Sequence, residues 1–202
     1  MGLLARAMAN ARYDTSAFLQ FLDGRPDERW ELIDGRPLMM AGGTVNDNLI
    51  ALNVARLLFS PARKSGCRVQ TSDVLVSASE DADFAAFPDV FVHCGPKSGN
   101  DRILSDPTIV VEVLWPSTMS RDRGLKFEKY RAMQSVQQII LIYQDQVRIE
   151  LWTRATTDDP SSADNWTLET LTRVSDVATL TSLEARLSLP DIYDDALPLT
   201  GT

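Results

Sequence analysis

The stretch Pro107–Pro116, PTIVVEVLWP, places a carboxylate inside an apolar strand pattern. Five of the six residues from Ile109 to Leu114 are β-branched or aliphatic, which is typical of a strand buried on both faces. The sixth is Glu112. Burying an unpaired carboxylate costs on the order of several kcal/mol. Glu112 therefore predicts an ion pair with a core-facing Arg or Lys, a cleft at this point of the strand, or a bound metal ion.

The length and composition of the chain are those of an ordinary folded domain. The 202 residues are 44% hydrophobic and 24% charged, so we expect one domain over residues 1–202 with a sizeable core. No apolar run approaches the roughly 18 residues of a membrane span. The N-terminal stretch has only a short apolar patch, without the long apolar region of a secretory signal. We expect residues 1–13 to form a frayed leader.

The cysteines and the histidine show no spacing that predicts chemistry. Cys67 and Cys94 lie far apart and match no metal-ligand pattern, so we expect neither a disulfide framework nor a zinc site. The corresponding expectation is a cytoplasmic protein in a reducing compartment. His93 is the single histidine, and a Ser-His-Asp triad would have to use it. Because it lies in the apolar run FVHC, we expect a structural role.

The charge balance of the chain is acidic. The net charge is −8, from 28 acidic against 20 basic side chains. Non-specific affinity for nucleic acid rests on many Lys and Arg contacts, so this balance argues against a broad phosphate-binding surface. An acidic protein can still carry a local basic cleft, or a metal ion that offsets the repulsion. The charge therefore opposes a nucleic-acid substrate without excluding it.

The order of the expected elements predicts a mixed α/β domain. Asp14 is placed as a helix N-cap, and Asp34-Gly35 is a strong two-residue turn inside a hairpin at 26–40. Helical periodicity and apolar runs define the other elements. We expect helices at 15–22, 44–64 and 123–133, strands at 67–76, 88–92, 109–114, 139–143, 147–152 and 166–171, and a tail with a short strand and a helical turn. This order fits a mixed β-sheet flanked by helices better than a doubly wound parallel sheet.

Asp89 is the best companion for Glu112. It follows Pro88 at the start of the expected strand 88–92, although Pro-Asp alone is a common turn. The order of Pro-Asp, a loop and an apolar strand with a Glu resembles the catalytic core of the PD-(D/E)XK nuclease superfamily, which has the restriction-endonuclease-like fold. In that superfamily an Asp and a Glu on adjacent strands bind magnesium, and a lysine two residues after the Glu helps to activate water. Leu114 stands at that lysine position here.

Further motifs resemble one bacterial family of this superfamily, the Uma-two family of restriction-endonuclease-like proteins. The resemblance runs from the first helix to the C-terminal tail and implies a single restriction-endonuclease-like domain. Each motif is short, and their common order and spacing make the match specific. In this chain the motifs are Asp27–Gly35, Met40–Thr44, Phe87–Val90, Val111–Leu114, Pro116–Thr118, Asp122–Gly124, Lys126–Phe127 and Tyr130.

The resemblance implies a magnesium site in which manganese can substitute. Asp89 and Glu112 correspond to the metal ligands, and the Val113 carbonyl is a candidate further oxygen. Glu31 corresponds to the family's early acidic residue, which lies against the metal site. Lys126 corresponds to a relocated lysine that the family commonly supplies from the helix after the strand. Such a lysine can orient the attacking water or stabilise charge on the phosphate.

Some residues near this core differ from the family pattern or have two interpretations. Tyr130 shares a helix face with Lys126, at i and i+4, and either packs, which is favoured, or contacts substrate. Trp115 replaces the family's usual Ser and could narrow the cleft or stack on a base. Asp47 stands where the family often has a His, a change that could weaken activity. Asp122 fits an N-cap of the helix.

The predicted function is magnesium-dependent cleavage of nucleic acid, either DNA or RNA, by in-line attack of water. A homodimer, which is common for this fold, would assemble a cleft that one chain lacks. Two alternatives stay open. Trp115, Asp47 and the net charge of −8 favour a catalytically idle binding or scaffold protein. A hydrolase of a smaller phosphate ester would tolerate an acidic surface better than a nuclease would.

Overall fold

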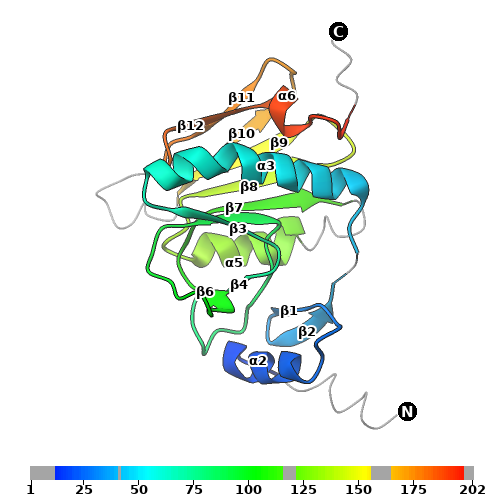
Figure 1. Cartoon of the computed structure of the whole chain (residues 1–202), viewed down its shortest axis with the longest axis vertical. Helices are drawn as coiled ribbons and strands as arrows, with labels where there is room; N and C mark the ends of the chain where they lie inside the picture. The colour runs from blue at the N-terminus through cyan, green and yellow to red at the C-terminus, as the bar shows by residue number, and fades with distance from the viewer. Residues whose placement is uncertain (1–11, 41, 116–121, 156–164, 198–202) are drawn as a thin grey trace.

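A six-stranded mixed sheet forms the centre of the protein, in a computed structural model that describes residues 12–40, 42–115, 122–155 and 165–197 (Figure 1). In sheet order the strands are β10 (Trp166–Leu171), β9 (Ile149–Arg154), β8 (Gln138–Tyr143), β7 (Pro107–Leu114), β5 (Val90–His93) and β3 (Arg68–Thr71). The pair β7–β8 is parallel, and the other neighbours are antiparallel. The predicted mixed sheet with flanking helices is confirmed.

The strand β7 is buried on both faces, as its sequence predicts. Val111 and Val113 belong to the core cluster on one face of the sheet, and Val110 and Leu114 belong to the cluster on the other face. Because side chains alternate along a strand, Glu112 lies on the second face, and it is 3% exposed. The carboxylate is therefore held inside the fold by a strand that is buried at seven of its eight residues.

One face of the sheet is covered by α3 together with C-terminal segments. These elements are α3 (Val45–Lys64), the hairpin of β11 (Val177–Leu180) and β12 (Ala185–Ser188), and the short α6 (Leu189–Ile192). The sequence predicts α3 closely, but only one strand of this hairpin. Among the described residues, no helix has both the length and the apolar character needed to cross a membrane.

The other face is covered by the crossover that joins β7 to β8. Parallel neighbours need such a crossover because a tight hairpin cannot join them. The expected helix at 123–133 is two elements: a π-helical turn, η1 (Asp122–Lys126), and then α5 (Phe127–Ala132). π-Helical turns are rare and occur frequently at functional sites. The change of helix type falls directly after Lys126.

A smaller unit packs against the edge of this arrangement (Figure 1). It contains α2 (Thr15–Asp23), β1 (Trp30–Ile33) and β2 (Arg36–Met39), next to the short parallel pair of β4 (Leu75–Val76) and β6 (Ile103–Leu104). As predicted, Asp14 caps α2, accepting from Ala17 N at 2.7 Å. Asp34 and Gly35 make the predicted turn with φ of 49° and 71°. Tyr13, inside the expected leader, donates its amide to Gly35 O at 2.8 Å.

Cys67 and Cys94 form a disulfide, which corrects the expectation of no disulfide. Cys67 directly precedes β3 and Cys94 directly follows β5. These strands are antiparallel with Arg68 opposite His93, so the two Cα atoms lie 4.0 Å apart. The separation of 27 residues in sequence hides this proximity. The expectation of a reducing cytoplasm rested on free thiols and loses that support.

Reducing this disulfide is expected to lower the free energy of unfolding by about 3 kcal/mol, because the cross-link removes conformational entropy from the unfolded chain. Urea unfolding with and without a phosphine reductant measures the difference. A Cys67→Ser/Cys94→Ser variant is the control, since reductant should leave its midpoint unchanged. Equal stability of oxidised and reduced wild-type protein would contradict the expected contribution.

His93 is buried at the end of β5, in the structural position expected from its sequence. It is 2% exposed, and its Nδ1 has no hydrogen-bond partner among the described residues. Burial lowers the pKa of His93 below its ordinary value of 6.5, although the charge of Asp106 acts in the opposite direction. The unfolded chain therefore binds a proton at His93 more readily than the folded chain.

It follows that His93 makes the fold less stable as the pH falls through the unfolded-state pKa, with the loss levelling off below the folded-state pKa. We expect the free energy of unfolding of the wild type to fall more steeply than that of His93→Gln between about pH 7 and about pH 5. Urea unfolding at several pH values measures both slopes. Parallel slopes would show that His93 is not the titrating group.

Candidate active site

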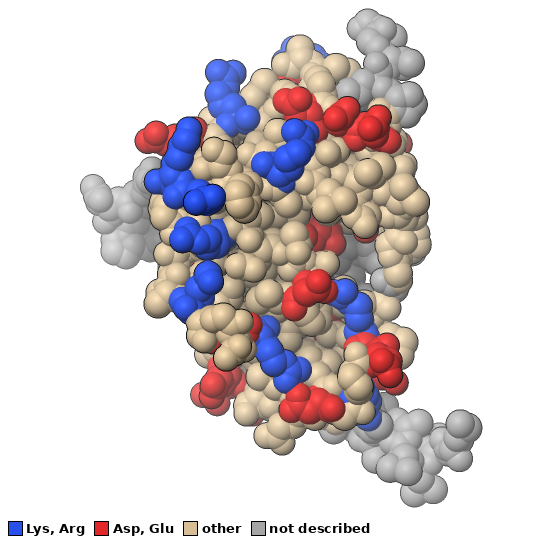
Figure 2. Space-filling view, in the orientation of Figure 1, with Lys and Arg blue, Asp and Glu red and all other residues tan. Residues whose placement is uncertain are grey.

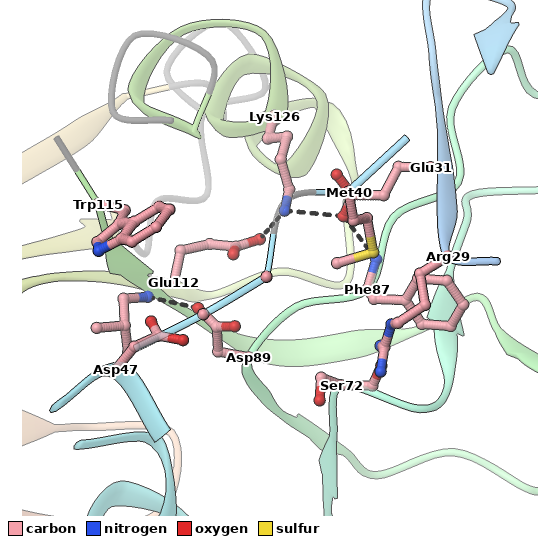
Figure 3. Close-up of a pocket in the computed structure, with 13 residues that line it drawn as sticks. Arg29, Glu31, Met40, Asp47, Ser72, Phe87, Asp89, Glu112, Trp115 and Lys126 are labelled. Carbon is pink, nitrogen blue, oxygen red and sulfur yellow. Dashed lines mark hydrogen bonds and ion pairs between the residues drawn. The ribbon is translucent and has the colours of Figure 1, made fainter. Parts of the chain in front are cut away.

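A cavity of about 230 Å³ opens where the ends of β1, β7, η1 and α3 meet the chain before β5 (Figure 3). Four carboxylates and two cations line it within the described part of the chain: Glu31, Asp47, Asp89, Glu112, Arg29 and Lys126. Four predicted catalytic residues are therefore brought together from segments that are far apart in sequence. The excess of carboxylates makes this an acidic pocket.

Asp89 and Glu112 share one face of the sheet. Val90 pairs with Val111 across β5 and β7. Continuing this antiparallel register by one residue places Asp89 opposite Glu112, with both side chains on the same face. Asp89 Oδ2 accepts a hydrogen bond from the backbone amide of Val113 at 2.7 Å. The carboxylate of Asp89 is thus fixed beside Glu112 at the cavity wall.

Lys126 reaches both of the other predicted carboxylates. Its Nζ lies 2.8 Å from Glu112 Oε1 and 3.0 Å from Glu31 Oε1. The lysine is 3% exposed, so its charge is held in place by these carboxylates more than by water. Lys126 is the last residue of η1, and Figure 3 shows its side chain extending from this turn toward the cavity. The ion pair expected for a buried Glu112 is present.

Glu31 connects three parts of the site. The residue projects from β1 and is 3% exposed. In addition to Lys126, it accepts a hydrogen bond from the Phe87 amide at 3.0 Å. Phe87 lies two residues before Asp89, so Glu31 fixes the segment that carries Asp89. This position agrees with an early acidic residue that abuts the site.

Tyr130 lies behind Glu112 and does not line the cavity. Its ring is fully buried, and its hydroxyl donates to Glu112 Oε1 at 2.8 Å. Burial and the neighbouring charge of Glu112 raise the pKa of Tyr130 well above its ordinary value, so the hydroxyl keeps its proton and donates. The full burial of Tyr130 favours the packing interpretation, and substrate contact by Tyr130 stays a prediction.

Trp115 and Val113 both line the cavity. Trp115 directly follows the C-terminal end of β7, which puts its half-buried indole at the rim, where base stacking remains a prediction. Val113 contacts Asp89 through its amide, while a role of its carbonyl stays untested. Pro116–Thr118 and the side chain of Asp122 lie outside the described residues.

Arg29 and Asp47 also line the cavity. The sequence assigned no role to Arg29 and marked Asp47 only as a departure from the family's usual His. Arg29 stands two residues before Glu31. In an extended segment this spacing puts both side chains on one face, and this is the sequence signal that could have identified Arg29. Asp47 lies in the first turn of α3, whose N-cap is Thr44. A Cβ atom at Gly43 would meet the end of the Asp47 side chain, which would have to rotate away.

The donor set fits a hard divalent cation. Asp89 and Glu112 would hold the ion with carboxylate oxygens, the ligands that Mg²⁺ prefers. No group of three or more His, Cys, Asp or Glu side chains in the described part of the chain is arranged to hold a metal by itself. Mg²⁺ keeps several waters and is commonly bound by one or two carboxylates plus substrate phosphate.

Known proteins resemble the chain in sequence. The Uma2 family, described as "Putative restriction endonuclease", matches residues 15–189. Two uncharacterized Synechocystis proteins, slr1290 and sll1609, are 31% identical over 136 residues and 29% identical over 126 residues. These matches cover 67% and 61% of this chain, and 70% and 71% of the relatives.

A solved structure resembles the chain in fold. It is the crystal structure of "a putative nuclease belonging to DUF820" from Anabaena variabilis. The match has a TM-score of 0.69 and covers 92% of this chain and 99% of that chain. At 14% sequence identity it shows the fold alone. The predicted restriction-endonuclease-like fold class is confirmed.

Proposed function

Because the family match spans residues 15–189, the chain belongs to the Uma2 family, as its motifs predict, and we propose that it is a magnesium-dependent phosphodiesterase that cleaves nucleic acid. The observation that carries this proposal is the contact between Lys126 and Glu112, at 2.8 Å, on a cavity that Asp89 also lines. Leu114 stands where the superfamily has its lysine, and in this proposal Lys126 of η1 takes over that role.

The metal ligands in this proposal are Asp89 and Glu112, with manganese as a substitute for magnesium. A bound divalent cation would supply Lewis-acid chemistry at the phosphate and a water that is nucleophilic at neutral pH. The protein contributes by fixing its own groups in advance. Asp89 is fixed by the Val113 amide, and Glu112 is fixed by Lys126 and the Tyr130 hydroxyl.

Lys126 and Glu31 supply charge and orientation. The ammonium of Lys126 keeps its position through two carboxylates, so it needs no rearrangement to stabilise the charge that develops on a phosphate. Glu31 holds Lys126 and the Phe87 amide together and so orders the residues around the metal. Arg29 is the second cation of the cavity and a candidate contact for a neighbouring phosphate.

Basic side chains are concentrated in one part of the surface, at the end of α3 opposite the cavity. Figure 2 shows Lys and Arg side chains gathered along the left edge of this face, where Figure 1 places the C-terminal end of α3. Exposed basic residues in the C-terminal half of α3 include Arg56, Arg63 and Lys64. Basic side chains are thus concentrated despite the net charge of −8. A homodimer, which is part of this proposal, would double this surface; light scattering tests it.

A catalytically idle binding or scaffold protein is the second candidate. The ion pair of Lys126 with Glu31 and Glu112 favours it, because the pair explains a buried Glu112 without any metal. This alternative predicts no stoichiometric binding of divalent cations. A hydrolase of small phosphate esters, by contrast, shares the metal site and differs only in substrate.

Cleavage of supercoiled plasmid, single-stranded DNA, RNA and bis(p-nitrophenyl) phosphate, each with Mg²⁺, Mn²⁺ or EDTA, tests the proposal. We expect polynucleotide cleavage that EDTA abolishes, with binding that weakens steeply as salt is added. Turnover of the small ester alone would assign the small-ester hydrolase. No turnover, together with no Mn²⁺ binding in a calorimetric titration, would assign the idle protein.

A further inference from the structure

The turn η1 carries two cations, Arg123 and Lys126, and each contacts a carboxylate on the sheet below. Lys126 contacts Glu112 on β7, and Arg123 Nη2 lies 3.0 Å from both carboxylate oxygens of Glu150 on β9. In the strand register Leu141 of β8 pairs with both Glu112 and Glu150. The two carboxylates therefore lie on the same face at the same level, two strand spacings or about 10 Å apart.

The carboxylate of Glu150 is buried and is held by three neighbouring side chains. It is 1% exposed and accepts from Arg123, from Arg148 Nη2 at 2.9 Å and from the Tyr143 hydroxyl at 2.9 Å. A buried carboxylate with this many partners keeps its position, because moving it would leave charges unpaired. None of the four residues lines the cavity of the candidate active site.

A second cavity lies between η1 and the strands β8 and β9. It has a volume of about 270 Å³ and is lined by Arg123, Gly124, Phe127, Leu141, Glu150 and Trp152. A Cβ atom built on Gly124 would meet nothing within 4 Å among the surrounding atoms. Among the described residues, no side chain therefore packs closely against η1 at Gly124. The contact between Arg123 and Glu150 spans this space and ties the turn to the sheet.

We infer that Arg123 and Glu150 are positioning residues that fix η1 and thereby hold Lys126 against Glu112. This inference rests on the proposed function. Neither residue touches substrate or metal ligands; both act through the placement of Lys126, three residues along the same turn. The carboxylate of Glu150 is fixed by its partners on the sheet, and its contact with Arg123 fixes the position of η1.

Arg148 provides a matched control. It binds the same carboxylate at 2.9 Å, and its side chain is 37% exposed, compared with 43% for Arg123. Arg148 lies next to β9 and not on η1. Arg148→Gln and Arg123→Gln thus remove equivalent charges from Glu150, but only Arg123→Gln releases η1.

The test compares Arg123→Gln, Arg123→Lys and Arg148→Gln with the wild type. The chain has four lysines, so ¹⁵N-lysine NMR, assigned with Lys126→Arg, observes the Lys126 ammonium directly. We expect Arg123→Gln to shift or broaden this signal and to lower kcat of metal-dependent cleavage about tenfold to a hundredfold, with little change in KM. Arg123→Lys should recover part of both, and Arg148→Gln should change both far less than Arg123→Gln, since Arg123 and the Tyr143 hydroxyl still hold Glu150.

An unchanged Lys126 signal in Arg123→Gln would overturn the inference, and so would equal effects of Arg123→Gln and Arg148→Gln. Urea unfolding of both variants shows whether a difference in kcat merely follows a difference in stability. The NMR signal does not depend on catalysis. If the wild type cleaves nothing, the proposed function fails, while the ammonium signal still decides whether Arg123 positions Lys126.

Discussion

Replacing Glu112 by Gln is expected to lower metal-dependent cleavage by about two to three orders of magnitude, the loss typical of removing one preorganised electrostatic group from an active site. Gln keeps the size of the side chain and an oxygen that can accept from Tyr130 and Lys126. It removes the negative charge that a divalent cation needs. Calorimetric titration with Mn²⁺ and plasmid nicking, both on wild type and variant, measure the two losses.

Glu128→Gln is the control for this experiment. Glu128 is a carboxylate on α5 whose side chain is 66% exposed, and it is not among the residues that line the cavity. Its replacement should leave cleavage and Mn²⁺ binding unchanged. Metal binding that survives Glu112→Gln would remove Glu112 from the ligand set. Binding lost without any wild-type cleavage would leave a metal-binding protein whose substrate is not nucleic acid.

Replacing Lys126 by Met is expected to have the largest effect on stability. The substitution leaves Glu31 and Glu112, each with a side chain 4% exposed, without the cation between them. Breaking a buried ion pair by removing one partner costs about 3 to 5 kcal/mol, because the remaining charge is uncompensated. Urea unfolding at neutral pH measures the loss, and cleavage should be lost as well.

The neighbouring Lys129 offers a matched comparison. It also bridges two carboxylates, Asp34 at 2.8 Å and Asp83 at 2.7 Å, but its side chain is 28% exposed. Lys129→Met should cost only about 1 kcal/mol or less, as for surface pairs. Adding Glu31→Gln and Glu112→Gln to Lys126→Met should recover much of the lost stability. A mild effect of Lys126→Met alone would mean that water, not the lysine, compensates the carboxylates.

The parts of the fold that sequence predicts are those with local signals. The apolar run of β7 requires burial on both faces whatever surrounds it. Asp34-Gly35 supplies the positive φ angles of a tight turn by itself. The periodicity of α3 places its buried face from within a single helix. Each of these patterns depends only on residues close in sequence, so each predicts its element without knowledge of the rest of the molecule.

The site was predictable only in part because it is made of long-range contacts. The family pattern names Glu31 and Lys126, but nothing local shows that residues 95 positions apart would touch. Asp47 enters the cavity only because α3 begins where β7 ends. The disulfide follows from the register of β3 with β5, which spacing along the chain does not encode. The hydrogen bonds of a π-helical turn span five residues, against four in an α-helix, and the apolar pattern of only five residues does not distinguish the two.

The disulfide also has a mechanical consequence for the cavity. α3 begins near Asp47 and ends shortly before Cys67, while β5 begins directly after Asp89 and ends directly before Cys94. Asp47 and Asp89 therefore lie at the starts of α3 and β5. The Cys67–Cys94 disulfide joins the chain just after the ends of these two elements. The helix side of this arrangement is held along its length, because four residues of α3 are buried against the sheet: Ile50, Val54, Leu58 and Ala62. One covalent bond and one packed helix face thus together fix the two segments that carry Asp47 and Asp89.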